Sequence, residues 1–379
     1  MRRLASALAA VAAMCALLTI KAQAMPPFAQ AYGMQCNECH TLVPTLNAYG
    51  RYVQRTGYAS LDPHVLRRAN PIWFGANTWY DTQDSSKPHY VQFGNLAIHA
   101  AGAAGDDWTY HAQTWIQQNN QAGDLDTLWV AYNNLFHRDG HAFVGYITAP
   151  GPSPWSMFTD LSGFATPEIT VGEHAYQTDA NRWGAKLAYT PGSTDAEIAW
   201  LGSGLGWSGA TDFQDDTDKT FQWKVAHANP MQPLEYGLYG SRGSVPLANG
   251  DVDRYTTWGL YAQRDPVGYV PGVLVMYQMN HDANPDESGL PVGSNAGTLE
   301  LYERIFNQQH DSPAGQGQIG LRKEFTNDGL GTVAQSGNVD LSYHIARYLF
   351  FYGEAGFAQN STPAWRWEIW WATPIQRQP

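Results

Sequence analysis

The chain has 379 residues, a formal net charge of −12 and a mean hydropathy of −0.39, and 13% of its residues are aromatic. This acidic balance argues against binding to nucleic acid, whose phosphates require Lys and Arg. A negative mean hydropathy together with 15 Trp and 21 Tyr is unusual for a compact enzyme. It is typical of an outer-membrane barrel, in which only alternate residues face lipid and aromatic side chains gather at both interfaces.

The first residues predict a secretory signal peptide over 1–24. Arg2 and Arg3 form a basic start, an apolar stretch rich in Ala and Leu follows, and Ala22-Gln23-Ala24 provides the small residues that signal peptidase requires. The apolar stretch is short for a membrane anchor, which needs about 20 apolar residues. Cleavage would remove three basic residues, so the net charge would change from −12 to −15 (−12 − 3).

Both cysteines beyond the signal peptide lie in one motif, Cys36-Asn37-Glu38-Cys39-His40. This is the spacing of covalent haem attachment, in which two thiols bind the haem vinyl groups and the adjacent histidine binds the iron. A thioredoxin-type pair would need a βαβ context, and a zinc site would need two further ligands at similar spacing. We therefore predict one covalent haem c, attached at Cys36 and Cys39, with His40 as the proximal ligand.

The sixth ligand of the iron is less clearly indicated. His64 is the other histidine of the N-terminal segment, so the predicted metal ligands are His40 and His64. Met34 lies too close to the motif in sequence to fold back over the iron. The alternatives are histidines of later segments that could equally be polar lining residues: His99, His111 and His344.

Residues 25–70 differ in pattern from the rest of the chain. Short helical patterns cover 28–32 and 46–56, and Pro71 ends the segment. About 45 residues are marginal for independent folding and too few to enclose a haem. We therefore expect this haem segment to plug or cap a larger structure.

From Ile72 onward the sequence alternates between apolar and polar residues in segments separated by Gly, Pro, Asn, Asp and Ser. Phe221 and Val225, for example, alternate with Gln222 and Lys224. Sixteen segments have roughly the length of a tilted membrane strand. They are 72–81, 90–99, 107–117, 125–134, 141–149, 182–190, 195–202, 219–227, 234–242, 254–263, 268–280, 298–307, 316–325, 338–345, 347–357 and 364–372.

Loop lengths distinguish a membrane barrel from a soluble β-sandwich, which would show the same alternation. Short connections near 136–140, 191–194, 265–267 and 346 alternate with long ones at 150–181, 203–218, 281–297 and 326–337. Membrane barrels have short periplasmic turns and longer extracellular loops. The predicted fold is therefore all-β, a transmembrane antiparallel β-barrel of about 16 strands over 71–379, with the helical haem segment plugging or capping it.

Residues 27–58 follow the pattern of a known family. The matching residues are Pro27-Phe28-Ala29, Gly33, Cys36-x-x-Cys39-His40-Thr41, Pro44-x-Leu46, Tyr49-Gly50-Arg51 and Gly57-Tyr58. The pattern resembles the fused monohaem cytochrome–porins of bacterial outer membranes, which include iron-oxidising cytochromes. The family has Arg, Phe, Phe and Lys where this chain has Gln30, Val43, Tyr49 and Gln54. Beyond residue 58 the resemblance rests on architecture.

The resemblance implies electron transfer at the outer membrane, with the haem segment on the periplasmic side or inside the barrel lumen. An extracellular donor such as Fe(II) would reduce the haem, and a periplasmic cytochrome or cupredoxin would accept the electron, which would make the chain an Fe(II)-oxidising cytochrome. The partners expected are these two and membrane lipid. The alternatives are a haem-plugged solute channel with a redox-responsive gate and a soluble periplasmic haem protein.

Acidic residues in two of the long predicted loops could concentrate cations, or could simply be solvated. They are Asp212, Asp215, Asp216 and Asp218 in one loop, and Asp282, Asp286 and Glu287 in the other.

Overall fold

The computed structural model describes residues 28, 31–68, 71–82, 90–118, 121–153, 168–176, 180–202, 219–306, 315–346, 348–359 and 361–374. The predicted signal peptide and the acidic residues of 203–218 lie outside this part of the chain. Within it, no helix combines the length and the apolar character needed to cross a membrane.

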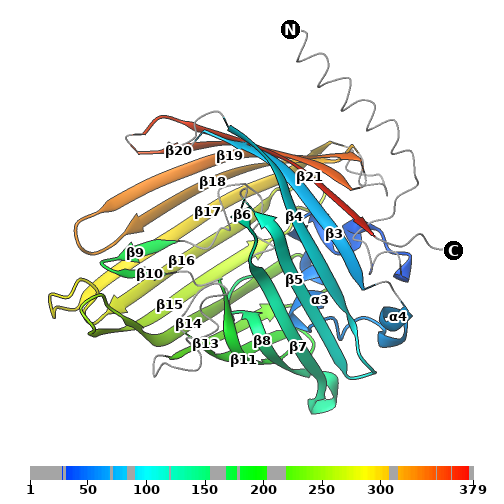
Figure 1. Ribbon diagram of the computed structural model, residues 1–379, viewed down its shortest axis with the longest axis horizontal. Helices are drawn as coiled ribbons and strands as arrows, with labels where there is room; N and C mark the ends of the chain where they lie inside the picture. The colour runs from blue at the N-terminus through cyan, green and yellow to red at the C-terminus, as the bar shows by residue number, and fades with distance from the viewer. Residues whose placement is uncertain are drawn as a thin grey trace, which may run out of the picture.

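Sixteen long antiparallel strands of the described residues close into a barrel, in which β21 pairs with β3 (Figure 1). The two-residue strand β6 (Gln121–Ala122) inserts between β5 and β7. The fold class predicted from the sequence is confirmed. The sixteen strands are β3 (Ile72–Asp81), β4 (Tyr90–Ala103), β5 (Trp108–Gln118), β7 (Leu125–Leu135), β8 (Gly140–Thr148), β11 (Asn181–Tyr189), β12 (Thr194–Gly202), β13 (Lys219–Ala228), β14 (Leu234–Pro246), β15 (Val252–Arg264), β16 (Gly272–Asp282), β17 (Val292–Phe306), β18 (Gly317–Asn327), β19 (Val333–Ala346), β20 (Leu349–Ala358) and β21 (Ala364–Pro374).

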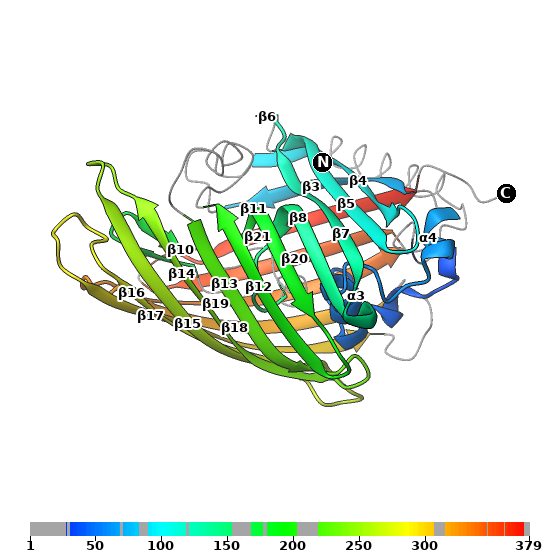
Figure 2. The same ribbon diagram turned by 90° about the horizontal axis from the view of Figure 1, so that it is seen from below.

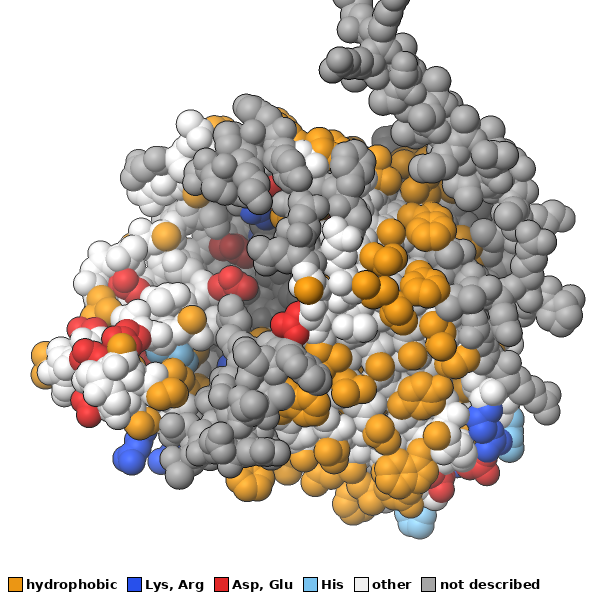
Figure 3. Space-filling model, in the orientation of Figure 1, with side chains coloured by type: hydrophobic (Ala, Val, Ile, Leu, Met, Phe, Trp, Pro, Cys, Tyr) orange, Lys and Arg blue, Asp and Glu red, His pale blue; other side chains and the backbone are white. Residues whose placement is uncertain are grey.

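The alternating pattern of each strand separates a lipid face from a lumen face. On β13, Phe221 and Val225 are about half exposed, whereas Gln222 and Lys224 are buried on the other face. Hydrophobic side chains accordingly cover much of the outer wall in Figure 3. Closure of the barrel pairs every strand on both sides, as hydrocarbon requires of a spanning backbone. This is a transmembrane β-barrel of the kind found in bacterial outer membranes.

The longest connections join strand ends on one side of the barrel. The short turns 136–139, 190–193 and 229–233 lie at one end, and the strand ends that 149–180 and 203–218 connect lie at the other; 307–316 is a longer connection at the first end, and 247–251 and 328–332 are short ones at the second. We call these the short-turn end and the long-loop end. In outer-membrane barrels they face the periplasm and the outside, respectively.

Two strands begin earlier than the sequence predicts. β17 starts at Val292 rather than 298, and β19 starts at Val333 rather than 338. The added residues of β17, Val-Gly-Ser-Asn-Ala-Gly, carry few large apolar side chains, so their alternation is weak. They are nevertheless held by backbone pairing, as Asp282 of β16 pairs with Val292.

The N-terminal segment occupies the short-turn end, where α3 lies inside the ring of strands and α4 lies beyond the strand ends (Figures 1 and 2). The predicted helix over 46–56 is present as α3. The strand pair β1–β2 and the helix α4 were not predicted. The elements are η1 (Cys36–Glu38), β1 (His40–Leu42), β2 (Thr45–Leu46), α3 (Ala48–Arg55) and α4 (Pro63–Arg68).

The long connection 149–180 contains a small hairpin that was predicted as loop. Its strands are β9 (Ile169–Val171) and β10 (His174–Tyr176). The hairpin packs through Val171 and Tyr176 against Tyr255 of β15 and Val292 of β17. In Figure 1 it lies at the end of the barrel opposite the N-terminal segment.

Candidate haem-attachment site

Cys36 and Cys39 flank one short turn of 3-10 helix, η1, at the short-turn end. Neither forms a disulfide; Cys36 is buried and Cys39 is partly exposed. Cys36 packs against Tyr348, in the tight step between β19 and β20. Burial raises the pKa of Cys39 to about 12, with a further contribution from Glu38. The cysteine motif therefore lies against the barrel wall through Cys36.

His40 directly follows the second cysteine and is buried. Its Nδ1 lies 3.0 Å from the carbonyl oxygen of Pro44. Because a carbonyl can only accept, Nδ1 carries the proton, and Nε2 keeps the lone pair that a metal requires. Such a bond from the far ring nitrogen commonly orients metal-binding histidines. Burial also lowers the pKa of His40 to about 4, which favours the neutral, ligating form.

An open groove of about 510 Å³ lies beside the motif. It is lined by Met34, Glu38 and Tyr49 on the segment side and by the turn 230–233 and Asp265 on the barrel side. Its size is within the range of small-molecule and cofactor sites. Glu38 brings the motif to this groove, whereas Cys36, Cys39 and His40 are not among its lining residues. The two cysteines and the neutral imidazole of His40 are the groups to which a haem c would attach.

Gly50 and Asn47 fix the motif on helix α3. A Cβ added at Gly50 would lie 2.0 Å from the carbonyl oxygen of Cys39, so only glycine allows this contact. Asn47 caps the helix by accepting from the Gly50 amide at 2.9 Å. Its amide group also donates to the carbonyl oxygens of Asn37 and Glu38, each at 3.0 Å. The attachment motif and α3 thus form one unit.

Arg51 fastens this unit to the barrel. Its Nε lies 2.9 Å from Glu235 Oε2, and its Nη1 lies 2.8 Å from Asp265 Oδ1. Asp265 also accepts from the backbone amide of Ala48 at 2.8 Å. Burial lowers the pKa of Arg51, but the carboxylates of Asp265 and Glu235 outweigh burial and raise it above its usual range. The guanidinium therefore stays charged between two buried carboxylates.

Arg55, a second basic residue of α3, also contacts the inner wall of the barrel. Arg55 Nη2 donates to the carbonyl oxygen of Ala228 at 2.5 Å, and Nη1 lies 3.8 Å from Glu235. Arg55 Nε lies 4.0 Å from Asp195, which is itself 2.7 Å from Lys224. The helix thus joins a network of buried charges on the barrel wall.

Tyr58 anchors the far end of the segment on β5. Its hydroxyl lies 2.5 Å from His111 Nδ1, and its ring lies edge-on to Phe28 at 4.8 Å. Gly57 and Tyr58 both have positive φ, +55° and +69°, which turns the chain into this position. A Cβ at Gly57 would meet the Phe143 ring at 2.7 Å. Glycine is therefore required at 57 by conformation and by space.

The candidates for the sixth ligand are scattered. His64 is exposed on α4, with its Nδ1 hydrogen-bonded to Arg67. His344 of β19 contacts the chain just after the motif, with Nε2 3.4 Å from the carbonyl oxygen of Val43. His99 stacks on Trp73, and His111 is engaged by Tyr58, so both belong to an aromatic cluster on β3, β4 and β5.

Sequence reasoning missed the barrel residues that hold the segment. Asp265 and Glu235 are more than 180 residues away from Arg51, and Tyr348 and Tyr352 are similarly distant from the motif. Nothing in local spacing points to such partners. Asn47 could have been found, because Asn immediately before a helical pattern is an N-cap signal.

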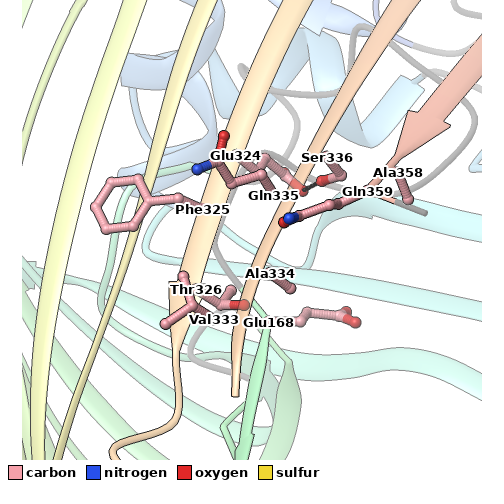
Figure 4. A pocket seen from close by; sticks show the side chains of 10 residues that line it. All are labelled: Glu168, Glu324, Phe325, Thr326, Val333, Ala334, Gln335, Ser336, Ala358 and Gln359. Atoms are coloured by element: carbon pink, nitrogen blue, oxygen red, sulfur yellow. Dashed lines mark hydrogen bonds between the residues drawn. The ribbon is translucent and has the colours of Figure 1, made fainter. Parts of the chain in front are cut away.

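The long-loop end carries an acidic pocket of about 370 Å³ between β18, β19, β20 and Glu168 (Figure 4). In it, Ser336 donates to Glu324 Oε2 at 3.2 Å. Figure 3 shows further acidic side chains in a hollow of the surface. One acidic residue assigned to a solvated loop was misplaced, because Asp282 is the last residue of β16 and is buried.

The chain is similar in architecture to solved outer-membrane proteins, porins among them. An anion-selective porin from Comamonas acidovorans aligns with a TM-score of 0.58 at 13% identity, over 80% of this chain and 98% of the porin. OprB of Pseudomonas putida aligns with a TM-score of 0.55 at 10% identity, over 80% and 93% of the two chains. OmpT of Vibrio cholerae aligns with a TM-score of 0.52 at 11% identity, over 80% of this chain and 97% of OmpT.

At these identities the likeness defines the fold, which is that of a porin-type transmembrane barrel. No family model matches the sequence, and the search of curated proteins gave no match.

Proposed function

We propose that this chain is an electron-transfer protein of the bacterial outer membrane, with one haem c attached to Cys36 and Cys39 and ligated by His40. An extracellular donor such as Fe(II) gives up one electron, and a periplasmic cytochrome or cupredoxin receives it. A covalent haem supplies one-electron Fe(III)/Fe(II) chemistry. The observation that carries the proposal is the attachment motif itself, in which neither cysteine forms a disulfide and the imidazole of His40 is neutral and oriented.

The other residues of the segment position the motif at one end of the barrel. Arg51 and Arg55 bind it to the inner wall at the short-turn end, which faces the periplasm in barrels of this type. A periplasmic carrier can approach from that side. The acidic pocket at the long-loop end offers an attractive field to a small cation arriving from outside.

We further propose that the chain belongs to the fused cytochrome–porins that residues 27–58 resemble. Four of the matching residues have structural reasons to be present. Pro44 accepts from His40, Gly50 contacts the Cys39 carbonyl, Arg51 binds two barrel carboxylates, and Tyr58 binds His111. The pattern therefore describes both an attachment motif and the means of docking it in a barrel.

For the sixth position we propose a histidine, either His64 of the segment or His344 of the barrel wall. The variants His64→Ala and His344→Ala distinguish the two. Loss of the low-spin visible spectrum in one variant, with the other unchanged, identifies the ligand. Low-spin spectra in both variants contradict ligation by either residue. A methionine ligand would also give a higher reduction potential than a second histidine.

The proposal is tested by a visible spectrum and a redox titration of the purified protein, followed by the addition of Fe(II). We expect the spectrum of one c-type haem per chain and reduction of that haem by Fe(II) at mildly acidic or neutral pH. Absence of a covalent haem overturns the proposal. If the haem is present but Fe(II) does not reduce it, iron is excluded as the donor and a different small donor is required.

A second candidate function is a solute channel in which the haem segment is a plug or redox-responsive gate. The shared porin fold favours it, since porins of this strand number enclose an aqueous lumen. Single-channel recording separates the two functions. Conductance that changes with the redox state of the haem supports the channel, and a barrel closed to ions rejects it.

A further inference from the structure

We propose that His174, Asp253 and Asp282 form a binding site for one divalent first-row transition-metal ion at the long-loop end of the barrel. The ion fastens hairpin β9–β10 to the wall formed by β15 and β16. The site is independent of the haem-attachment motif and of the electron transfer proposed above.

The three residues come from separate parts of the chain. His174 opens β10, Asp253 is near the outer end of β15, and Asp282 ends β16. Asp282 pairs with Tyr255, two residues along from Asp253, so both aspartates lie on the lumen face of neighbouring strands. The hairpin is held close to them by its turn, because Glu173 donates its amide to the Pro285 carbonyl at 2.7 Å.

The distances between the donor atoms suit a single ion. One ligand atom from each of the three residues lies within 4.8 Å of the others. His174 Nδ1 is 2.8 Å from Asp282 Oδ1 and 3.6 Å from Asp253 Oδ2. Nitrogen and oxygen ligands about 2.0–2.2 Å from one metal ion lie roughly 3–3.6 Å apart. Imidazole together with carboxylates is a donor set for Zn(II), Fe(II) and Mn(II).

The cluster brings two buried carboxyl groups together beside a single imidazole. The side chains of Asp253 and Asp282 are 0% exposed, and the Oδ2 atom of each has no hydrogen-bond partner among the described residues. Among the described residues, His174 is the one basic side chain within ion-pair distance of these two aspartates. A single imidazolium neutralises one of the two carboxylates, and an unpaired buried carboxylate is costly. A dication balances both.

The surrounding groups orient the three ligands as outer partners of metal sites do. Tyr176 donates its hydroxyl to Asp282 Oδ1 at 2.6 Å. The backbone amides of Ala283 and Asn284 donate to Asp253 Oδ1 at 2.9 and 2.8 Å, which leaves Oδ2 directed at His174. The ring of His174 also packs on Tyr176 and Tyr255, with centroids 3.9 and 4.4 Å away.

The site is remote from the haem-attachment motif. Asp265, which binds Arg51 of the haem segment, marks the position of that segment on the barrel. It lies twelve residues after Asp253 (265 − 253), and nearly all of these residues belong to the continuous strand β15. At about 3.3 Å per residue this is roughly 40 Å. An ion bound at His174 therefore stabilises the hairpin and does not touch the haem, so either proposal can fail without the other.

The test is metal binding by the full-length purified protein after removal of ions with a chelator. Zn(II) alone is titrated by calorimetry, and bound metal is counted by elemental analysis. We expect one Zn(II) per wild-type chain, with affinity at least tenfold weaker in Asp282→Asn and in His174→Gln. Asp286→Asn is the matched control, because Asp286 is an exposed acidic residue of the adjacent loop. It is expected to bind as the wild type does.

Heat-modifiable migration in gels shows that each variant retains its barrel, and the visible spectrum reports haem separately. Zn(II) should also slow proteolysis within 149–180 in the wild type and not in Asp282→Asn. Absence of Zn(II) binding by the wild type, equal binding by wild type and Asp282→Asn, or loss of binding in Asp286→Asn overturns the proposal. Binding of Ca(II) without binding of Zn(II) contradicts the assigned class of metal.

Discussion

The barrel and the N-terminal segment are held together in different ways. Every barrel strand pairs with its neighbours in sequence or closes the ring, and the outer face is stabilised by lipid. The segment has only short helices and a two-strand pair, and its firmest contacts reach residues 184 to 217 positions away. We therefore expect the fold of the segment to depend on closure of the barrel more than the barrel depends on the segment.

The barrel strands and the N-terminal segment are also held by different kinds of interaction. Barrel strands are specified by alternation and backbone hydrogen bonds, which tolerate many substitutions. The segment is docked by ion pairs whose partners are almost fully buried. Breaking such a pair by removing one partner typically costs about 3–5 kcal/mol. Single substitutions should consequently affect the segment far more than the barrel.

The largest effect is expected from replacing both attachment residues, Cys36→Ala with Cys39→Ala. Without thiols no thioether forms, so covalent haem should be lost completely while the heat-modifiable barrel persists. Mass spectrometry of the intact chain and haem staining of denaturing gels measure the two properties. Covalent haem retained in the double variant would contradict the assignment of the motif.

Arg51→Ala should release the segment from the barrel. It leaves Glu235 and Asp265 buried without their common cation, at an expected cost of about 3–5 kcal/mol in docking free energy. Hydrogen exchange of the α3 amides in detergent measures this cost. The matched control is Arg67→Ala, which removes an exposed ion pair with Asp106 and should cost less than about 1 kcal/mol. Equal exchange in the two variants would disprove the docking role of Arg51.

Gly50→Ala should disturb the motif from within the segment. Its Cβ would lie 2.0 Å from the Cys39 carbonyl oxygen, so helix and motif must move apart, at about 1–3 kcal/mol. Lower haem content per chain and faster exchange at α3 are the expected readouts. Gly293→Ala serves as the control, since nothing lies within 4 Å of a Cβ there. Wild-type haem content in Gly50→Ala would refute the close contact.

Tyr58→Phe should have the smallest effect. It removes one hydroxyl, and with it the hydrogen bond to His111, while the ring contact with Phe28 remains. The expected loss is about 1 kcal/mol, measured by thermal melting of the haem signal. Tyr269→Phe, at an exposed turn residue, is the control. A melting temperature equal to that of the control would show that the hydroxyl does not anchor the segment.

The two regions also differ in how far the sequence predicts them. All sixteen predicted barrel segments coincide with strands, because a half-lipid, half-lumen environment imposes a period of two on every strand. The bounds were poorest at β17 and β19, where small residues weaken the alternation. The hairpin β9–β10 was missed because three-residue strands carry too little pattern.

In the N-terminal segment, the sequence predicts the attachment motif and a place in or against the barrel, but not the barrel residues that hold the segment; haem attachment stays a prediction. Cys36, Cys39 and His40 are recognisable from their spacing, and helix α3 from its periodicity. The contact of Arg51 with Asp265 depends on closure of the barrel, which brings residues distant in sequence together. The roles of Glu235 and Asp282 as buried carboxylates are hidden for the same reason.

The central claim is that electrons cross the membrane through a haem held in the barrel mouth. It is tested most directly in proteoliposomes that carry the protein, with Fe(II) added outside and an oxidised cytochrome trapped inside. We predict reduction of the trapped cytochrome by the wild-type protein and none by the Cys36→Ala, Cys39→Ala double variant. Equal reduction by both proteins, or none by either, would contradict the account.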